Sequence, residues 1–448
     1  MVSRLVSVDR WAAGSQAYFL THLHSDHTNG LSSSWANGPL FCSRTTAKLF
    51  PFKFPEFNLS LIRILQIGTW HSLSLLSPCG SETHLQVMAI DAIHCPGSVM
   101  LVFRGEFGCL LYTGDFRWEA TCERAMRSRD MLLGALKDQV VDIIHLDNTY
   151  CNPSYDFPPR QIAANQVVNI ILSHPEHDII IGIDTLGKED LLHHIARVLK
   201  IKVSSYPFLR IWVWPERLRT MHLLGFHDIF TTNTSLTRVR AVPRYSFSIE
   251  TLEALNKVHP TIGIMASGLP WLKTGLQMSG THAGSFRISR SERAPWSANC
   301  EVQSDRQVGN TGPLERFHEY IYSVPYSDHS NFAELKEFVK LVRPNTLKGI
   351  VSSSSCYIEP MYYLGRHCGI TQPARQLHMK HTSKGTIERV VAVSTKASTL
   401  DDEFVKSESK RRKTLKVKSS GSRSTKFSIL RRRGRGAKIS ENDGPHNS

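Results

Sequence analysis

The heptapeptide THLHSDH at residues 21–27 is the feature that most restricts how this chain can fold. It places three histidines and an aspartate within six positions, directly after the apolar run AYFL. Neutral imidazole and carboxylate groups suit zinc, and also manganese or iron. Three imidazoles buried without a metal would together need several hydrogen-bond partners. The pattern therefore predicts a metal site that includes His22, His24, Asp26 and His27.

Three later segments each carry one more potential ligand. If THLH continues a strand, His22 and His24 point to the same face, since side chains alternate along a strand. Four residues cannot complete the coordination of two metals, so further ligands must come from elsewhere. The segments DAIHCPGS, LYTGDFR and YSDHSN put a histidine or an aspartate where an apolar strand meets a loop, a position where active-site groups are often held. They add His94, Asp115 and His329.

The pattern of the chain predicts an α/β protein with a large antiparallel component. Short β-rich runs separated by polar turns fill the first 150 residues, and helical spacing alternates with apolar strands from about 158. The segment TTAKLFPF begins like a helix that its prolines end early. We expect a long loop over 268–313, which is rich in Ser, Gly and Thr, and we assign no structure to a Pro-containing insertion at 203–211.

Charge and cysteine content add two expectations. The net charge is +15, but residues 404–448 hold 14 Lys or Arg against 3 Asp or Glu, which leaves only +4 on the first 403 residues. That remainder is weak evidence for a nucleic-acid groove. The nine cysteines are scattered singly without CxxC, so neither a disulfide framework nor a zinc ribbon is indicated. The sequence contains no stretch of 18 apolar residues that would predict a membrane span, so we expect no membrane partner.

The motifs together resemble a known family. HxHxDH, HCPGS and YTGDFR resemble the metallo-β-lactamase fold, and LDNTYCNP, LGKED and YSDHS resemble its β-CASP branch of nucleic-acid-processing enzymes. In this order they are similar to the DNA cross-link-repair nucleases, over roughly residues 1–370. The resemblance implies a four-layer αββα sandwich with an inserted α/β β-CASP domain and a disordered basic C-terminal tail.

The resemblance also implies domain boundaries. Residues 1–155 and 318–385 would form the two parts of the metallo-β-lactamase domain. Residues 156–317 would form the β-CASP domain, and residues 386–448 the tail.

The ligand set that the resemblance implies has two metals, with zinc as the expected ion. His22, His24 and His94 would hold one metal, Asp26, His27 and His329 the other, and Asp115 would bridge them. Asp9 in SVDRW would orient a ligand, and Asp147 in LDNTY would support His329 or help proton transfer. The residues with expected catalytic roles are Asp26, Asp115, His329, Asp147 and Asp9.

The expected reaction is phosphodiester hydrolysis by a metal-activated hydroxide that attacks phosphorus in line. His329 or Asp26 would assist the leaving 3′-oxygen, and the sequence does not choose between them. In DTLGKED, a Gly-Lys pair at a helix start makes a phosphate pocket plausible. Thr185, Gly187 and Lys188 would there bind the 5′-phosphate of a DNA end.

The resemblance implies a 5′→3′ exodeoxyribonuclease in interstrand cross-link and double-strand-break repair. RNA-processing members are expected to carry a histidine where KGIVSSSS has Val351, which favours DNA. An RNA-processing β-CASP endonuclease remains the alternative; a small-molecule hydrolase and an inactive DNA-binding scaffold are less favoured. The runs KRRK and RRRGR predict nuclear localisation or phosphate contacts. Expected partners are DNA ends, with a 5′-phosphate preferred, and repair or telomere proteins.

Overall fold

The computed structural model describes residues 5–76, 80–137, 139–202, 210–268, 316–351 and 358–369. The tail expected at 386–448 lies outside the described residues, as do nearly all of the loop expected at 268–313 and most of the insertion at 203–211. The described part is a mixed α/β fold built on three sheets, which confirms the predicted class.

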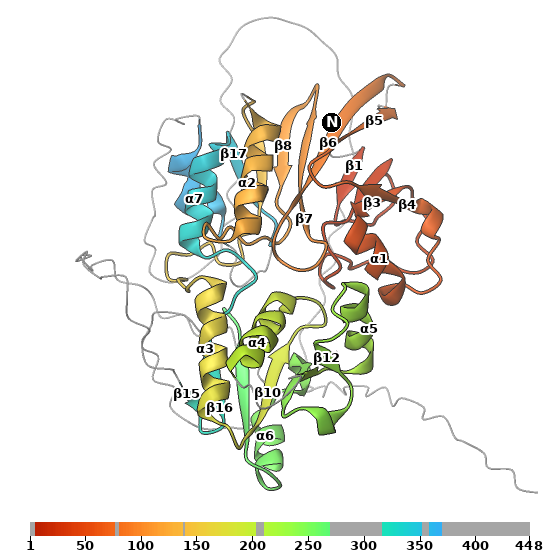
Figure 1. The fold of residues 1–448 in the computed structure, drawn as a ribbon. Helices are drawn as coiled ribbons and strands as arrows, with labels where there is room; N and C mark the ends of the chain where they lie inside the picture. Colours follow the sequence, from red (N-terminus) through yellow and green to blue (C-terminus); the bar gives the residue numbers. More distant parts are fainter. Residues whose placement is uncertain are drawn as a thin grey trace, which may run out of the picture. The chain divides into compact units, whose positions relative to one another are not determined.

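Two of the sheets come from the first half of the chain and one late strand (Figure 1). A parallel sheet of four strands contains β1 (Val6–Val8), β2 (Ala17–Phe19), β3 (Leu40–Ser43) and β4 (Ile62–Leu65). A six-stranded sheet contains β5 (Trp70–Leu76), β6 (Glu82–Asp91), β7 (Val99–Gly105), β8 (Gly108–Tyr112), β9 (Ile143–Leu146) and β17 (Thr346–Gly349). Its strands β5 to β8 are antiparallel, and β9 and β17 extend it in parallel.

Alternating side chains place a core on each face of these sheets. Along β6, Val87 and Ala89 pack with residues of the four-stranded sheet such as Phe19. Met88 and Ile90 point into a second core shared with two helices. Because both faces are buried, the strands read as nearly continuous apolar runs in the sequence.

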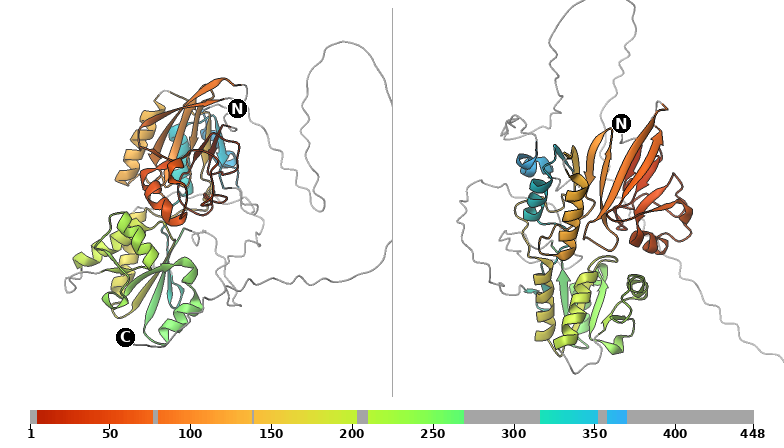
Figure 2. Two further views of the ribbon diagram at one scale, coloured as in Figure 1. Left: turned by 90° about the vertical axis from the view of Figure 1, so that its right-hand side faces the viewer. Right: turned by 45° about the horizontal axis from the view of Figure 1, so that its top comes forward.

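Helices cover the outer faces of the two sheets (Figures 1 and 2). Helices α2 (Glu123–Leu136) and α7 (Phe332–Val342) pack on the six-stranded sheet through residues such as Leu132 and Phe338. Helix α1 (Arg44–Lys53) packs on the four-stranded sheet through Phe50. Helix α7 begins with a capping box between Asn331 and Glu334.

Helix α1 differs from the prediction, because its proline does not end it. Pro51 lies inside the helix, which continues to Lys53. Pro51 removes one helical hydrogen bond, but its neighbour Phe50 is fully buried in the core. Packing of the helix therefore outweighs the local preference.

The third sheet has seven strands in the order β12-β11-β13-β10-β14-β16-β15. Its strands are β10 (Asp178–Ile183), β11 (Ile211–Trp212), β12 (Phe230–Thr231), β13 (Val239–Pro243), β14 (Thr261–Ala266), β15 (Arg316–His318) and β16 (Ile321–Val324). Its helices are α3 (Arg160–Ser173), α4 (Glu189–Lys202), α5 (Pro215–Leu223) and α6 (Ile249–Asn256). Ile179 and Ile181 of β10 face the core with α3 and α4, whereas Ile180 faces Leu252 of α6.

The remaining described elements are short. They are α8 (Pro360–Leu364) and the 3₁₀ turns Leu59–Leu61, Thr234–Leu236, Arg244–Ser246 and Gly365–His367. In the part of the chain that the structure describes, no helix combines the length and the apolar character needed to cross a membrane.

The chain changes sheets later than the expected boundary at 317/318. Strand β16 pairs in parallel with β14, so residues 321–324 belong to the seven-stranded sheet. Only after Val324 does the chain return, through α7 and β17, to the six-stranded sheet. The boundary was implied by the family resemblance, and an apolar strand such as β16 is compatible with either sheet.

We predict that Phe338→Ala lowers the free energy of unfolding by about 3–5 kcal/mol. Phe338 is fully buried and its ring lies 4.8 Å from both Phe116 and Trp118. Urea unfolding followed by circular dichroism measures the change. Glu337→Ala, on the exposed side of the same helix, is the control and should stay within about 0.5 kcal/mol of the parent. Equal effects of the two variants would contradict this core assignment.

Candidate metal centre

Every expected ligand lies in a loop that follows a strand. His22, His24, Asp26 and His27 follow β2, His94 follows β6, Asp115 follows β8, and His329 follows β16. The expectation that His22 and His24 share a strand is wrong, because β2 ends at Phe19. Their rings nevertheless lie together, with centroids 4.6 Å apart.

Three imidazoles direct one ring nitrogen each toward a common point. His22 Nε2, His24 Nδ1 and His94 Nε2 are the converging atoms, and the last two lie 3.0 Å apart. The other nitrogen of each ring faces an acceptor: Thr21 Oγ1 for His22, Leu186 O for His24 and Asp328 O for His94, at 3.0, 2.9 and 3.0 Å. These contacts fix the tautomers that leave the converging nitrogens free to bind a metal.

The donor set fits a metal ion. His22 Nε2 is fully buried and has no hydrogen-bond partner among the described residues. A buried polar atom left in this state is costly. A divalent cation bound by the three imidazoles would remove that cost, and ligand atoms of these residues together with Cys95 all lie within 4.8 Å of one another.

Asp115 lies between two groups of histidines. Its Oδ2 is 3.5 Å from His22 Nε2 and 3.7 Å from His94 Nε2, and its Oδ1 is 3.2 Å from His27 Nε2. The carboxylate is almost fully buried. Its two oxygens thus face different histidines, as a bridging ligand requires.

His27 and His329 each hold an aspartate on the nitrogen that faces away from Asp115. His27 Nδ1 donates to Asp9 Oδ2 at 2.7 Å, and His329 Nδ1 donates to Asp147 Oδ2 at 2.8 Å. Asp9 also accepts from the backbone N–H and the hydroxyl of Thr21. Such carboxylate–histidine pairs orient metal ligands.

The structure does not assemble the expected second metal set completely. His329 groups with His94 and Asp115, and His27 groups with His22 and Asp115. The Asp26 side chain is 78% exposed, with Oδ2 3.8 Å from His27 Nε2. Asp26 therefore lies at the solvent side of the cluster, next to the group that it was expected to join.

Burial and charge set the protonation of the cluster. Burial lowers the pKa of His94 to about 3 and that of His22 well below its usual value, so both rings are neutral. Burial also lowers the pKa of His27, but Asp115 and Asp9 outweigh it and raise it to about 11. For His329, Asp147 and Asp115 outweigh burial and raise the pKa to about 9. Burial raises the pKa of Asp115, but His27 and His329 hold it well below its usual value.

Three of the six non-glycine residues with positive φ in the described part of the chain lie at or near the cluster. Asp9, Ile93 and Lys188 have φ angles of 51°, 58° and 63°. Such angles are uncommon for residues other than glycine, and a β-branched residue such as Ile93 is a clear outlier. Each strained residue either contacts a ligand histidine or lies within two residues of a group that does, which is where functional strain is usually found.

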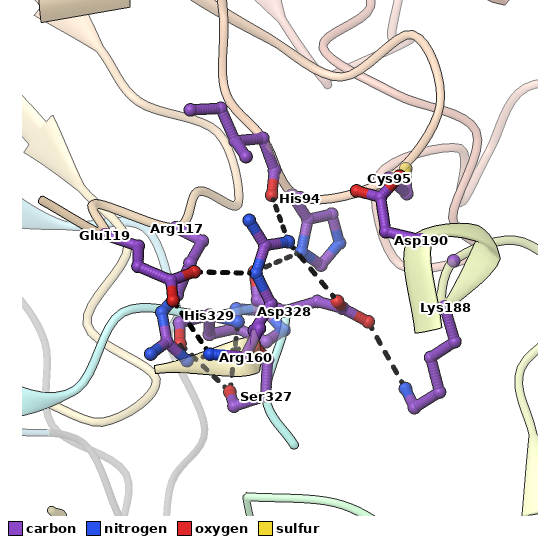
Figure 3. A network of polar contacts seen from close by, with 12 residues as sticks. His94, Cys95, Arg117, Glu119, Arg160, Lys188, Asp190, Ser327, Asp328 and His329 are labelled. Atoms are coloured by element: carbon purple, nitrogen blue, oxygen red, sulfur yellow. Dashed lines mark hydrogen bonds and ion pairs between the residues drawn. The ribbon is translucent and has the colours of Figure 1, made fainter. Parts of the chain in front are cut away.

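The expected phosphate-pocket residues lie beside the cluster, but Lys188 is already paired. Its buried Nζ is 2.9 Å from Asp184 Oδ2. It is also 3.3 Å from Asp328 Oδ2, a contact drawn in Figure 3. Asp328 and Asp184 outweigh burial and raise the pKa of Lys188, so its charge is retained. Thr185 is exposed, and the Gly187 N–H donates to Glu189 at 3.0 Å. The pocket stays a prediction, and these contacts weigh against it.

Four groups beside the cluster were not found from the sequence. Cys95 follows His94 directly in HCPGS; burial raises the pKa of its thiol well above the usual value, which disfavours a thiolate ligand. Asp328 precedes His329, and Thr21 precedes His22. Because Cys95, Asp328 and Thr21 are each adjacent to a candidate ligand in the sequence, their position was the signal that could have identified them. The carbonyl of Leu186 leaves no trace in the sequence.

We predict that Asp9→Asn lowers the affinity for Zn²⁺ by roughly 10–100-fold, because His27 loses the carboxylate that orients it. Competition with a chromophoric chelator measures the affinity. Asp178→Asn removes a carboxylate that pairs with Arg240 in the seven-stranded sheet, and it should leave the affinity unchanged. Unchanged affinity in Asp9→Asn would show that the pair does not serve a metal.

We also predict that the apparent affinity for Zn²⁺ rises with pH between 6 and 8. In this range the raised pKa values of His27 and His329 keep both rings protonated in the metal-free protein. A metal must displace those protons, so falling pH opposes binding and rising pH favours it. Zinc titrations at several pH values, with proton release recorded, provide the measurement. An affinity independent of pH would exclude protonated rings as ligands.

Comparison with known proteins agrees with this geometry. Residues 226–355 match the family model described as DNA repair metallo-beta-lactamase. The 5' exonuclease Apollo of Gallus gallus is 35% identical over 363 residues, which cover 80% of this chain and 64% of that protein. The DNA cross-link repair protein SNM1 of Arabidopsis thaliana is 30% identical over 76% of this chain and 62% of its own length.

A further relative shares the same region. The DNA cross-link repair 1A protein of Homo sapiens is 30% identical over 75% of this chain and 28% of its own length. The chain thus spans less than two thirds of the length of each of these relatives. The family model matched over residues 226–355 and the relatives, which align with three quarters or more of the chain, show that it belongs to the DNA-repair metallo-β-lactamase family.

Proposed function

We propose that the chain is a metal-dependent 5′→3′ exodeoxyribonuclease that hydrolyses phosphodiesters at DNA ends in interstrand cross-link and double-strand-break repair. The observation that carries the proposal is the convergence of His22, His24 and His94 on one point, with Asp115 between them and the other histidines. Relatives named for 5′ exonuclease activity and for cross-link repair support the choice of reaction and substrate.

We further propose that two divalent ions, zinc in the first place, occupy the cluster. His22, His24 and His94 would hold one ion, His27 and His329 would serve the other with Asp26 at the solvent side, and Asp115 would bridge. When bound, two such ions lower the pKa of water toward neutrality and offset the charge of the reacting phosphate.

The residues of the chain contribute orientation and charge. Asp9 and Asp147 hold His27 and His329 by their Nδ1 atoms and direct Nε2 of each ring into the cluster. Asp147 is itself fixed, because its oxygens accept from the Thr149 hydroxyl and N–H and from the Phe116 N–H. The proposed four-layer αββα arrangement is supported by one core between the two sheets and one on each outer face.

Val351 supports DNA over RNA as the substrate. Its backbone N–H donates to the Asn148 side chain at 2.8 Å, and its C=O accepts from the same side chain at 3.2 Å. Asn148 follows Asp147 directly in the sequence, so Val351 is held beside the Asp147 segment. The Val351 side chain offers no polar atom at the place where RNA-processing members are expected to carry histidine. The basic runs behind the proposed nuclear localisation lie outside the described residues.

The test uses a single-stranded DNA with a 5′-phosphate and a label at its 3′ end, next to a 5′-hydroxyl version and an RNA copy. We predict chelator-sensitive shortening from the 5′ end, with phosphate and DNA preferred. Asp115→Asn should abolish cleavage because it removes the carboxylate between the two histidine groups.

DNA affinity separates the proposal from its alternatives. Asp115→Asn should bind the same DNA as tightly as the parent does, and Asp178→Asn should retain full cleavage as the matched control. Cleavage of RNA alone would favour the RNA-processing alternative, and full metal loading without any cleavage would favour a DNA-binding scaffold.

A further inference from the structure

The loop that carries Lys188 also supports two histidines of the proposed metal centre. It runs from Asp184 to Lys188, between β10 and α4 of the seven-stranded sheet. We call it the 184–188 loop. Its Leu186 carbonyl accepts from His24 Nε2 at 2.9 Å, although the two residues are 162 positions apart. A backbone atom of the insert thus sets the tautomer of a histidine in the first part of the chain.

Lys188 acts on the second histidine through Asp328. Its Nζ pairs with Asp328 Oδ2 at 3.3 Å, and the Asp328 carbonyl accepts from His94 Nδ1 at 3.0 Å. Asp328 also faces Arg160, whose Nη1 is 3.8 Å from Asp328 Oδ1 and bonds to the Ile93 carbonyl at 3.0 Å. Figure 3 shows the Asp328 side chain between Lys188 and Arg160, with the His94 ring beside it.

A fully buried arginine, Arg217, binds the backbone of the 184–188 loop. Arg217 of α5 donates to the carbonyls of Thr185 and Gly187 and pairs with Glu189 at 2.7 Å. Gly187 and Lys188 both have positive φ angles. A strained turn persists only when its surroundings over-determine it, and the bonds of Arg217 and Lys188 provide that support.

We infer that Lys188 is a positioning residue of the metal centre, which holds Asp328 and through it His94, and that it is not the ligand of the 5′-phosphate. In both roles the Lys188 ammonium lies beside the cluster. As a positioning residue it pairs with Asp328, whereas as a phosphate ligand its charge would have to face the DNA end. The ammonium is buried and lies between two carboxylates, Asp184 and Asp328. Two of its three N–H donors are taken by these carboxylates, which offset its charge, and its burial restricts the access of a phosphate to the third. Groups that hold metal ligands in this way typically change metal affinity by roughly 10–100-fold when they are removed.

The inference rests on the proposed metal-dependent activity, but its main test does not require activity. Zn²⁺ affinity is measured by competition with a chromophoric chelator for the full chain and for Lys188→Met, and Co²⁺ absorption reports the ligand geometry. We expect Lys188→Met to lower Zn²⁺ affinity by roughly 10–100-fold and to alter the Co²⁺ spectrum. Lys257→Met, at an exposed lysine after α6, is the matched control and should change neither.

The ratio of cleavage rates for 5′-phosphate and 5′-hydroxyl DNA separates the two roles of Lys188. We expect Lys188→Met to slow both substrates equally, so that the ratio is kept. Unchanged Zn²⁺ affinity in a folded variant would overturn the inference. Unchanged affinity together with a lost phosphate preference would return Lys188 to the phosphate pocket.

A second variant covers the case in which Lys188→Met does not fold, as judged by circular dichroism. Asp328→Asn keeps the size of the side chain and the carbonyl that faces His94 but removes the charge that Lys188 holds. We expect the same loss of Zn²⁺ affinity, and unchanged affinity in the folded variant would overturn the inference. In the double variant the losses should not add, because both changes break one chain of contacts. A parent chain that binds Zn²⁺ but cleaves no DNA would contradict the proposed function and leave this test intact.

Discussion

The structure depends on burying several imidazoles and one carboxylate at the meeting point of loops from different sheets. An imidazole buried with an unpaired ring nitrogen costs free energy, and two unpaired nitrogens cost more. The chain meets half of this demand with its own groups, since one nitrogen of each of His22, His24 and His94 faces an acceptor. The other half is left to an ion. That division explains why the loops must be held precisely: each acceptor belongs to a different segment of the chain.

Holding those segments requires charge inside the protein as well as apolar packing. Arg117, Arg160 and Arg217 are all buried, and each pairs with a glutamate, namely Glu334, Glu119 and Glu189. Each also donates to backbone carbonyls of loops near the cluster. A buried ion pair is weak evidence for stability, because desolvation offsets its attraction. Its use here is geometric: a guanidinium with five donors can fix one carboxylate and several carbonyls at once.

The sequence predicted which side chains lie together in the candidate metal centre better than it predicted their surroundings, for a physical reason. His22, His24 and His27 are close in the chain, and His94 and Asp115 follow clear apolar strands, so residue type and context were enough to select side chains that the structure brings together. The strand predicted through His22 was wrong because a loop with fixed hydrogen bonds can bring alternate residues to one side as well as a strand does. The sheet to which Ile321–Val324 belongs could not be read from the sequence, because an apolar strand fits any sheet. Groups that act through the backbone, such as the Leu186 carbonyl, could not be found from residue types at all.

The contacts of Lys188 in the structure change the role that its sequence motif predicts. A Gly-Lys pair before a helix is typical of phosphate binding, because the helix start offers free N–H groups. Here the first residues of α4 are acidic, Glu189 accepts from the Gly187 N–H, and two carboxylates hold the lysine. Asp184 takes a second cation, Arg244, at 3.3 Å, so the charges of this loop already balance one another. A DNA end would therefore find little free positive charge at the 184–188 loop. Under the proposed function, recognition of the end phosphate would therefore fall to cations elsewhere on the chain, while the contacts of this loop serve the geometry of His24 and His94.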